Sequence, residues 1–387
     1  MQHAPSRRRQ RIMRILKWTV TLVIGLWLVG CRAAALVSPE QEPLLAFLPF
    51  TTALAVIANG LVFVFLLFRK RLLRSAVPLI ALIAAADAIK PVFGSPLRQA
   101  AQSLATRPEF KVLLWNVHGL GIYDLPEDKS VPQKMLQFIR EQDPDIVFLV
   151  EFYTDYQDAM KPHSARFMEE GGFREFRFVW DNTLGTKIYI GIGMFSKLPV
   201  SAIQERWIAH NISLLQSDVS IDPETRIRFL TLHLESFRLA DKDKAVLDEA
   251  KGGGAGVKGS LQLMKKYMQR SIQPFQNRAK EADSVAGIIA ESPYPVIVCG
   301  DLNDIPGSYA YTTVRGELGD AFADYGKPFG RTYNRLAPTL RIDHIFYDPA
   351  ALRCVDFKTF RTTLSDHNPI LATFELKTGR EAAAQPE

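Results

Sequence analysis

Three long apolar runs occupy the first quarter of the chain. The longest, Pro43–Phe68, is an uncharged run of 26 residues, and about 20 apolar residues are enough for a helix to span a bilayer. A shorter run, Trp18–Cys31, follows a dense basic cluster, and a third, Ser75–Phe93, carries two charged residues near its far end. The pattern predicts a membrane region over residues 1–93 with two to three transmembrane helices.

The first of these runs has two interpretations. The basic segment Arg7–Lys17, followed by an apolar core, resembles the start of a secretory signal peptide. The tetrapeptide Leu28-Val-Gly-Cys31 resembles a lipoprotein cleavage site, with Cys31 as the lipidated residue. A signal-anchor helix is the preferred interpretation, because a second apolar run follows so closely along the chain.

From residue 109 onward the apolar runs are short, as expected for buried β-strands. The clearest of them are Lys111–Val117, Asp143–Glu151, Arg226–His233, Pro295–Gly300 and Arg341–Ile345. Residues 260–290 show instead the loose periodicity of a helix. The sequence therefore predicts an α/β catalytic domain over residues 109–378, preceded by a linker at 94–108 and followed by a disordered polar tail at 379–387.

Polar side chains stand at the ends of the short apolar runs. Asp301 and Asn303 follow the run Pro295–Gly300, and because they are two residues apart we expect both on one face of the strand end. A carboxylate and a carboxamide in that place can orient a water molecule and hold a phosphate oxygen. The pair Asp366–His367 adds a metal ligand beside a proton carrier. This set of groups is suited to cleaving phosphoesters.

The chemistry-bearing residues follow one another in a definite order. In chain order they are Asn116, Glu151, His233, Asp301 with Asn303, Asp343, and Asp366 with His367. That order resembles the endonuclease/exonuclease/phosphatase superfamily, which includes deoxyribonucleases, inositol polyphosphate phosphatases and neutral sphingomyelinases. The resemblance covers roughly residues 110–376 and includes the run Gly191–Val200, which resembles a central strand of that family. It implies a four-layer α/β sandwich, in which two packed mixed β-sheets are flanked by helices.

A divalent cation, Mg²⁺ or Mn²⁺, is the expected cofactor. Phosphodiester cleavage needs an activated water molecule and neutralisation of the charge that develops on the phosphate. Magnesium prefers hard oxygen ligands and usually keeps several water molecules, so one or two carboxylates suffice to bind it. Glu151 is the first choice as metal ligand, with Asn116 and Asp366 close by.

The resemblance also implies roles for the catalytic residues. Asp301 would orient or deprotonate the nucleophilic water, and Asn303 would contact the phosphate. Asp343 would hold the imidazole of His367, which fixes the tautomer and raises the basicity of that ring. His233 would contact the phosphate or protonate the leaving oxygen. The sequence leaves open which histidine is the acid and which is the base.

Two further histidines, His118 and His344, lie inside the same motifs and are interpreted as structural or supporting residues. Some relatives support the first catalytic histidine with a carboxylate on an earlier strand. No such carboxylate is identified between residues 173 and 196 for His233.

The two parts of the chain carry opposite net charges. Residues 1–106 have a net charge of +10 and the remainder −4, which together give the +6 of the whole chain. Nucleic-acid binding needs basic charge near the active site, so the acidic catalytic domain favours a lipid-linked or small phosphoester as substrate. The alternatives are an extracytoplasmic metal-dependent nuclease and, from another class, a catalytically inactive binding module on the same fold.

Basic clusters predict the orientation of the chain in a membrane. Segments 7–17 and 69–74 are dense in Lys and Arg, whereas the 32–43 loop holds one Arg and two Glu, and Lys/Arg-rich segments stay cytoplasmic. A third span over 75–93 would then place the catalytic domain outside the cytoplasm. The sequence predicts a multi-pass cell-membrane phosphoesterase whose partners are the lipid bilayer and a phosphoester substrate, with no protein partner evident.

Overall fold

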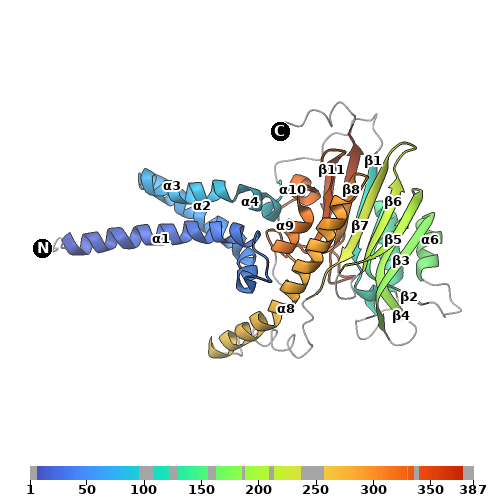
Figure 1. Ribbon diagram of the computed structural model, residues 1–387, viewed down its shortest axis with the longest axis horizontal. Helices are drawn as coiled ribbons and strands as arrows, with labels where there is room; N and C mark the ends of the chain where they lie inside the picture. The colour runs from blue at the N-terminus through green and yellow to red at the C-terminus, as the bar shows by residue number, and fades with distance from the viewer. Residues whose placement is uncertain are drawn as a thin grey trace.

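The computed structural model of this chain describes residues 7–95, 109–122, 130–155, 163–184, 188–208, 213–236, 257–328, 330–334 and 340–377. Figure 1 shows a helical region, drawn in blue, at one end of the molecule and a domain of two β-sheets at the other. The long helix α8 runs along the side of the sheet domain and extends past it toward the helical region.

The first sheet contains six strands in the order β11–β12–β1–β2–β4–β3. β1 and β2 are parallel, with Val112 opposite Ile146, and the other neighbours are antiparallel. Both central strands are nearly continuous apolar runs, because each of their faces is covered. The strand bounds are Glu109–Asn116 (β1), Ile146–Asp155 (β2), Glu175–Leu184 (β3), Ile188–Ser196 (β4), Leu352–Thr359 (β11) and Ile370–Leu376 (β12).

The second sheet also contains six strands, in the order β5–β6–β7–β8–β10–β9. Its central pair, β7 and β8, is parallel, and His233 stands opposite Asp301 at the end of that pair. Each sheet is therefore mixed and has one parallel pair near its middle. The strand bounds are Val200–Trp207 (β5), Ser213–Ser220 (β6), Arg226–His233 (β7), Val296–Asp301 (β8), Gly319–Asp320 (β9) and Asp343–Tyr347 (β10).

The two sheets pack face to face and helices cover their outer faces. Phe148 of β2 and Phe229 of β7 meet between the sheets, with their ring centroids 5.5 Å apart, in a core drawn from both sheets. This arrangement confirms the predicted four-layer α/β sandwich. The helices on the first sheet are α5 (Val131–Gln142) and α6 (His163–Gly171), and those on the second are α8 (Val257–Ala290) and α9 (Tyr309–Arg315).

The first 93 residues are helical over most of their described length. Two segments, Arg7–Ala34 and Pro43–Phe68, are long and apolar enough to cross a membrane. The third candidate consists of two helices that meet at an angle of 68°, so the predicted span over 75–93 is not one straight helix. The helices are α1 (Arg7–Ala34), the 3₁₀-helix η1 (Pro43–Thr51), α2 (Thr52–Phe68), α3 (Leu72–Ala84) and α4 (Ala86–Phe93).

The two charged residues of the third apolar run lie in α4, after its bend, and both are paired. Asp87 of α4 pairs with Arg32 of α1, with Oδ2 and Nη2 2.6 Å apart. Lys90 of α4 pairs with Asp324 of α10 (Ala321–Tyr325) in the sheet domain, at 2.7 Å. Charged side chains are costly in a bilayer interior. By turning aside from α3, α4 places both charges beside partners outside the apolar part of the helices.

The chain stays attached to the sheet domain directly after α4. The backbone N–H of Ser95 donates to the backbone oxygen of Gly326 at 3.2 Å, and its hydroxyl donates to the backbone oxygen of Ala323 at 2.7 Å. The predicted linker over 94–108 therefore begins with residues packed on the sheet domain. Residues 96–108 and the predicted tail lie outside the described part of the chain.

A buried arginine links the helical region to the sheet domain. Arg341 donates to Asp320 Oδ2 at 2.8 Å and to the backbone oxygen of Pro91 in α4 at 2.9 Å. Its guanidinium also lies 4.3 Å from the ring centre of Phe322. Because Arg341 is almost fully buried, its charge depends on these partners for compensation.

Replacement of Arg341 by Met should lower the free energy of unfolding by about 3–5 kcal/mol, because it leaves the buried Asp320 carboxylate without its cationic partner. The matched control is Lys358→Met, whose side chain is 57 % exposed in a pair with Asp356 and should contribute less than about 1 kcal/mol. Chemical denaturation of the detergent-solubilised chain measures both. Equal losses in the two variants would contradict a stabilising buried link.

Candidate active site

The predicted site residues gather where the two sheets meet. Asn116 and Glu151 come from the parallel strands β1 and β2 of the first sheet, and His233 and Asp301 from the parallel strands β7 and β8 of the second. Parallel neighbours present their carboxyl ends at the same edge, which is where α/β proteins commonly bind ligands. The loop before β12 adds His367 to this seam between the sheets.

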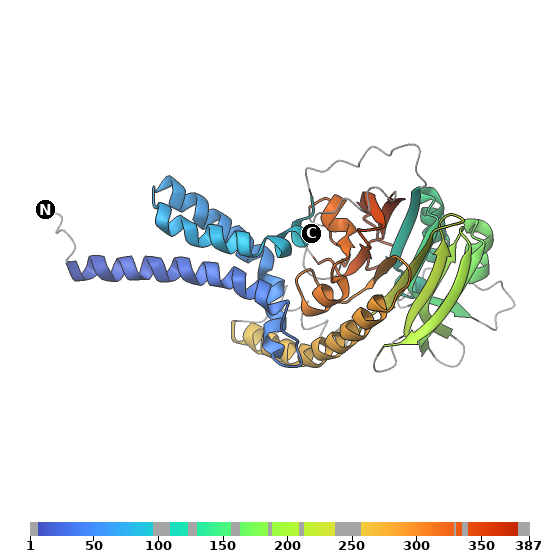
Figure 2. The same cartoon turned by 45° about the horizontal axis from the view of Figure 1, so that its top comes forward.

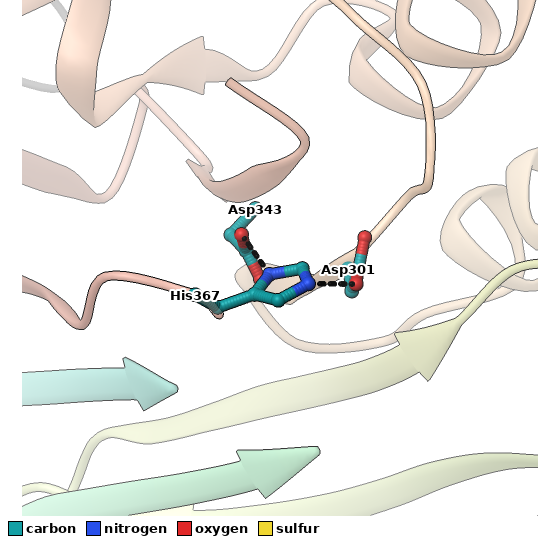
Figure 3. A group of neighbouring side chains, drawn as sticks. All are labelled: Asp301, Asp343 and His367. Atoms are coloured by element: carbon teal, nitrogen blue, oxygen red, sulfur yellow. Dashed lines mark hydrogen bonds and ion pairs between the residues drawn. The ribbon is translucent and has the colours of Figure 1, made fainter. Parts of the chain in front are cut away.

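His367 lies between two aspartates (Figure 3). Its Nδ1 is 2.8 Å from Asp343 Oδ2, and its Nε2 is 3.7 Å from Asp301 Oδ2. All three side chains are buried. The hydrogen bond from Nδ1–H to Asp343 fixes the tautomer and the orientation of the ring. The structure thus brings together the pair that the sequence analysis assigned to each other.

The loop that carries His367 is tied to the end of β1. The indole of Trp115 donates to the backbone oxygen of His367 at 3.0 Å. Ser365 Oγ donates to the backbone oxygen of Asn116 at 2.8 Å and accepts from the backbone N–H of His367 at 3.1 Å. These bonds hold the imidazole in place before any substrate binds, which is the condition for a preorganised site.

The amide of Asn116 joins two carboxylates from different sheets. Its Nδ2 donates to Glu151 Oε1 and to Asp301 Oδ2, at 3.1 Å in each case. Its Oδ1 accepts from the backbone N–H of His118 at 3.0 Å. Asn116 is buried; its Nδ2 positions the two acids, and its Oδ1 is used by the backbone of His118.

Glu151 occupies a strained backbone position within β2. Its φ angle is 53°, and the pairing of β2 with β4 shifts register at this point, which marks a β-bulge. The prediction that the strand ends at Glu151 is wrong, because the bulge re-aims this side chain while β2 continues to Asp155. His118 and Asn303 also have positive φ angles, of 46° and 49°. Such strain is concentrated at functional sites.

The spacing predicted that Asn303 and Asp301 share one face of the strand end, and this prediction is wrong. β8 includes Asp301 and does not stop at Gly300, and the positive φ of Asn303 ends the alternation of faces. The backbone N–H of Asn303 donates to Asp301 Oδ1 at 2.8 Å, and its Nδ2 donates to the backbone oxygen of Leu234 at 2.9 Å. Asn303 therefore orients Asp301 from a turn and fixes the residue after His233.

Burial and charge set the protonation states at the centre of the site. Burial, together with the neighbouring Asp343 carboxylate, raises the pKa of Asp301 to about 6. Burial by itself lowers the pKa of His367, but the charges of Asp343 and Asp301 outweigh it and raise this pKa to about 10. At neutral pH the imidazole is a cation between two carboxylates. A cation in this place can donate a proton or stabilise negative charge on a phosphate.

Two other histidines flank Glu151. Nδ1 of His118 lies 3.8 Å from Glu151 Oε2 and 3.4 Å from Asp366 Oδ1. Nε2 of His233 lies 3.9 Å from Glu151 Oε1. These contacts with two predicted metal ligands fit the interpretation of His118 as a structural or supporting residue. Its only signal in the sequence was its position two residues after Asn116.

The contacts of His344 are those of a structural residue. The ring is fully buried, with Nδ1 2.7 Å from Arg341 Nη1 and Nε2 3.0 Å from the backbone oxygen of Asp304. Burial and the adjacent Arg341 charge lower the pKa of His344 well below its usual value. The ring is therefore neutral at physiological pH, and it supports the turn after β8.

A buried glutamate of α8, which the sequence analysis missed, lies close enough to His233 for their charges to interact. Glu281 Oε2 accepts from the backbone N–H of Glu235 at 2.9 Å, and Oε1 has no hydrogen-bond partner among the described residues. Burial raises the pKa of Glu281 to about 7, against the lowering effect of the charges of Arg278 and His233. A glutamate in the middle of a long, polar helix gives no sequence signal of such a position.

The oxygen donors at the seam suit a hard divalent cation. The Glu151 side chain is 24 % exposed, so an ion bound there keeps water ligands, as Mg²⁺ requires. Asn116 contacts this carboxylate directly, and Asp366 shares the imidazole of His118 with it. A second group, Asp301 with Asp343 and His367, has ligand atoms within 4.8 Å of one another. That group is buried and its imidazole is already engaged, so the Glu151 set fits Mg²⁺ or Mn²⁺ better.

Comparison with known proteins identifies the family. The model of the endonuclease/exonuclease/phosphatase family matches residues 113–367, and the chain belongs to that family. It is accordingly a hydrolase of phosphoester bonds. A domain of unknown function, DUF8431, matches residues 11–92. A search of curated proteins found no match to the chain.

Solved structures with a similar fold have low sequence identity to this chain. An endonuclease/exonuclease/phosphatase from Beutenbergia cavernae is 18% identical, with 70% of this chain and 72% of that chain covered and a TM-score of 0.49. The catalytic domain of human nocturnin with bound sulfate is 15% identical, with 70% and 96% covered and a TM-score of 0.48. A family protein from Bacteroides thetaiotaomicron is 15% identical, with 70% and 100% covered and a TM-score of 0.49.

Glu281 makes the stability of the chain depend on pH. Its pKa of about 7 in the folded state exceeds its value of 4.5 without burial, so the folded chain retains this proton to higher pH. Its contribution to stability is complete below pH 4.5 and is lost as the pH rises through 7. Relative to Glu281→Gln, the wild type should lose up to about 3 kcal/mol of unfolding free energy across this window.

Denaturation of both proteins at several pH values, followed by tryptophan fluorescence, measures this difference. The control is Glu291→Gln, which changes a 66 % exposed carboxylate at the end of the same helix and should keep the wild-type pH profile. If Glu281→Gln and the wild type had parallel pH profiles, Glu281 would not be the titrating group.

Proposed function

We propose that this chain is a membrane-anchored, divalent-metal-dependent phosphoesterase that acts outside the cytoplasm on lipid-linked or small phosphoesters. The observation that carries the proposal is the buried row Asp343–His367–Asp301, connected through Asn116 to the more exposed Glu151. It combines a cationic proton donor, a carboxylate of raised pKa and an oxygen ligand for a metal at one seam.

In this proposal Glu151 is the principal ligand of Mg²⁺ or Mn²⁺, with Asn116 and Asp366 beside it. The bound cation would supply charge neutralisation for the phosphate. The protein contributes the fixed geometry of these ligands. The bulge at Glu151 aims its carboxylate into the seam, and the hydrogen bond from Asn116 holds it there.

The remaining residues divide the proton transfers between them. Asp301 has a pKa close enough to neutrality to take a proton from the attacking water. His367 stabilises the negative charge on the phosphate and is kept cationic by Asp343. His233, at the end of β7, lies beside the carboxylate of Glu151, the proposed metal ligand. In this position it contacts the phosphate or protonates the leaving oxygen. Asn303 contributes by fixing Asp301 and the backbone beside His233.

Contacts between the catalytic domain and the membrane region support a substrate close to the bilayer. Phe275 of α8 packs against Phe47 and Phe50 of η1, with ring centroids 5.0 and 6.2 Å apart. Lys280 of α8 pairs with Glu40 at 3.2 Å. The domain is therefore docked at the end of the apolar helices (Figures 1 and 2). Together with its net negative charge, this location favours a lipid-linked or small phosphoester over duplex nucleic acid.

The proposal is tested by substrate hydrolysis with the purified full chain. In detergent, and with Mg²⁺ or Mn²⁺, it should cleave phospholipids or bis(p-nitrophenyl) phosphate, and EDTA should abolish turnover. Asp301→Asn and His367→Ala should each reduce turnover about a hundredfold or more. Glu151→Gln should raise the metal concentration needed for half-maximal rate, because an amide oxygen is a poorer ligand for a hard cation.

The control is Asp356→Asn, which changes a carboxylate on β11 paired with Lys358 and should leave turnover near that of the wild type. Near-normal turnover of Asp301→Asn or His367→Ala would refute the assigned roles. Efficient, salt-sensitive cleavage of duplex DNA without activity on lipid would identify a nuclease instead. A wild type inactive on all these substrates would favour a binding module.

The extracytoplasmic orientation rests on two basic clusters, one at the start of α1 and one directly after α2. With segments 7–17 and 69–74 held in the cytoplasm, the bent α3–α4 pair must deliver the catalytic domain to the other side. A phosphatase reporter that is active only after export, fused after residue 107, should be active in whole cells. The same reporter fused after residue 70 should be inactive. Activity at 70 and none at 107 would reverse the orientation.

A further inference from the structure

The end of the helical region farthest from the sheets contains a basic cavity of ≈ 1040 Å³. It lies between the first turns of α1 and the turn that joins α2 to α3, at the end of the helices that points away from the catalytic domain in Figures 1 and 2. Its basic lining residues are Arg9, Arg14, Lys17, Lys70, Arg71 and Arg74. None of them belongs to the catalytic machinery.

The positive charge of this cavity is not balanced by acidic residues in its described lining. No Asp or Glu lines it among the described residues. Residues 1–39 and 43–86 contain no acidic residue at all. Six cationic side chains around one cavity repel one another unless an anion lies between them, so the composition of the cavity points to a negatively charged ligand.

Arg74 shows that the cavity is built into the helical packing. Its Nη2 donates to the backbone oxygen of Lys17 at 2.7 Å and to Thr21 Oγ1 at 2.8 Å. Its guanidinium lies 5.8 Å from the ring centre of Trp18, and its Nε is buried without a hydrogen-bond partner among the described residues. These contacts hold a charged group from α3 against α1, and one buried nitrogen is left for an acceptor from a ligand.

The wall of the cavity is partly apolar. Met13, Trp18, Leu72 and Leu73 line it beside the cations. A ligand that satisfies both kinds of surface has an anionic head and an apolar body. The cavity also lies where the apolar helices end, at the depth of lipid headgroups if α1 and α2 span a bilayer. Basic pockets between transmembrane helices bind anionic lipid headgroups in this way.

We propose that this cavity binds the phosphate headgroup of an anionic phospholipid, in the leaflet opposite the catalytic domain. The lipid phosphate neutralises the cations from α1 and from the α2–α3 turn at once and so joins these two elements. The site is separate from the active site, and its occupancy does not depend on which side of the membrane holds the catalytic domain.

The test compares two triple variants that lose the same charge. Lys17→Gln with Arg71→Gln and Arg74→Gln removes three cations from the cavity. Arg8→Gln with Arg11→Gln and Arg69→Gln removes three cations from the same helix and turn that do not line it. The full chain in neutral detergent is titrated with phosphatidylglycerol or phosphatidylcholine, and bound lipid is counted by native mass spectrometry.

The wild type should prefer phosphatidylglycerol, and the cavity variant should bind it at least about tenfold more weakly, since each basic residue near a headgroup contributes. The control variant should bind within about twofold of the wild type.

A second pair of variants leaves Arg74 and its hydrogen bonds intact. Arg14→Gln with Arg71→Gln changes the cavity, Arg11→Gln with Arg69→Gln is its control, and the two should show the same contrast. Equal weakening in both sets would mean diffuse attraction and would overturn the proposal. Displacement of the lipid by millimolar inorganic phosphate would also overturn it, in favour of a free-phosphate site.

Discussion

Three of the contacts at the candidate active site join one β-sheet to the other. His367 precedes a strand of the first sheet and binds Asp343 of the second. Asn116 of β1 donates to Asp301 of β8, and Glu151 of β2 lies beside His233 of β7. The packing of the sheets, through pairs such as Phe148 and Phe229, therefore sets the distances between the catalytic groups. A change of sheet spacing would separate acid from base without touching either.

The same arrangement explains how the fold tolerates buried charge and strained backbone in one place. Unpaired carboxylates cost several kcal/mol when they are removed from water, and Asp301 and Asp343 avoid this through the cation of His367. The positive φ angles of Glu151 and Asn303 cost about 1–3 kcal/mol each. The continuous apolar strands beneath them supply the stability that offsets this strain, which is why the site lies at the end of the best-buried part of the domain.

The strands could be predicted because their apolar runs are short and end in polar residues, and the order of those residues indicated the family. Local geometry could not. A β-bulge at Glu151 and a left-handed turn at Asn303 leave no trace in the hydrophobic pattern, so the strand end and the shared face were predicted wrongly. Glu281 lies on a distant helix and accepts from the backbone of Glu235, two residues after His233, and a pattern read along the chain cannot detect such a tertiary contact. The ion-pair partners of the charged residues in α4 also lie far away in sequence.

The catalytic domain and the N-terminal helical region meet at two separate places. Arg341 and Lys90 fasten α4 to the domain, while Phe275 and Lys280 fasten α8 to the segment before α2. Two attachments prevent the rotation that a single flexible tether would allow. If α1 and α2 span a bilayer, as proposed, the seam keeps a constant position relative to it, and a phosphoester must reach the seam by diffusion or from the membrane itself. A docked domain of net negative charge gains little electrostatic binding energy from a long polyanion such as nucleic acid. This is the physical basis for favouring small or lipid-linked substrates.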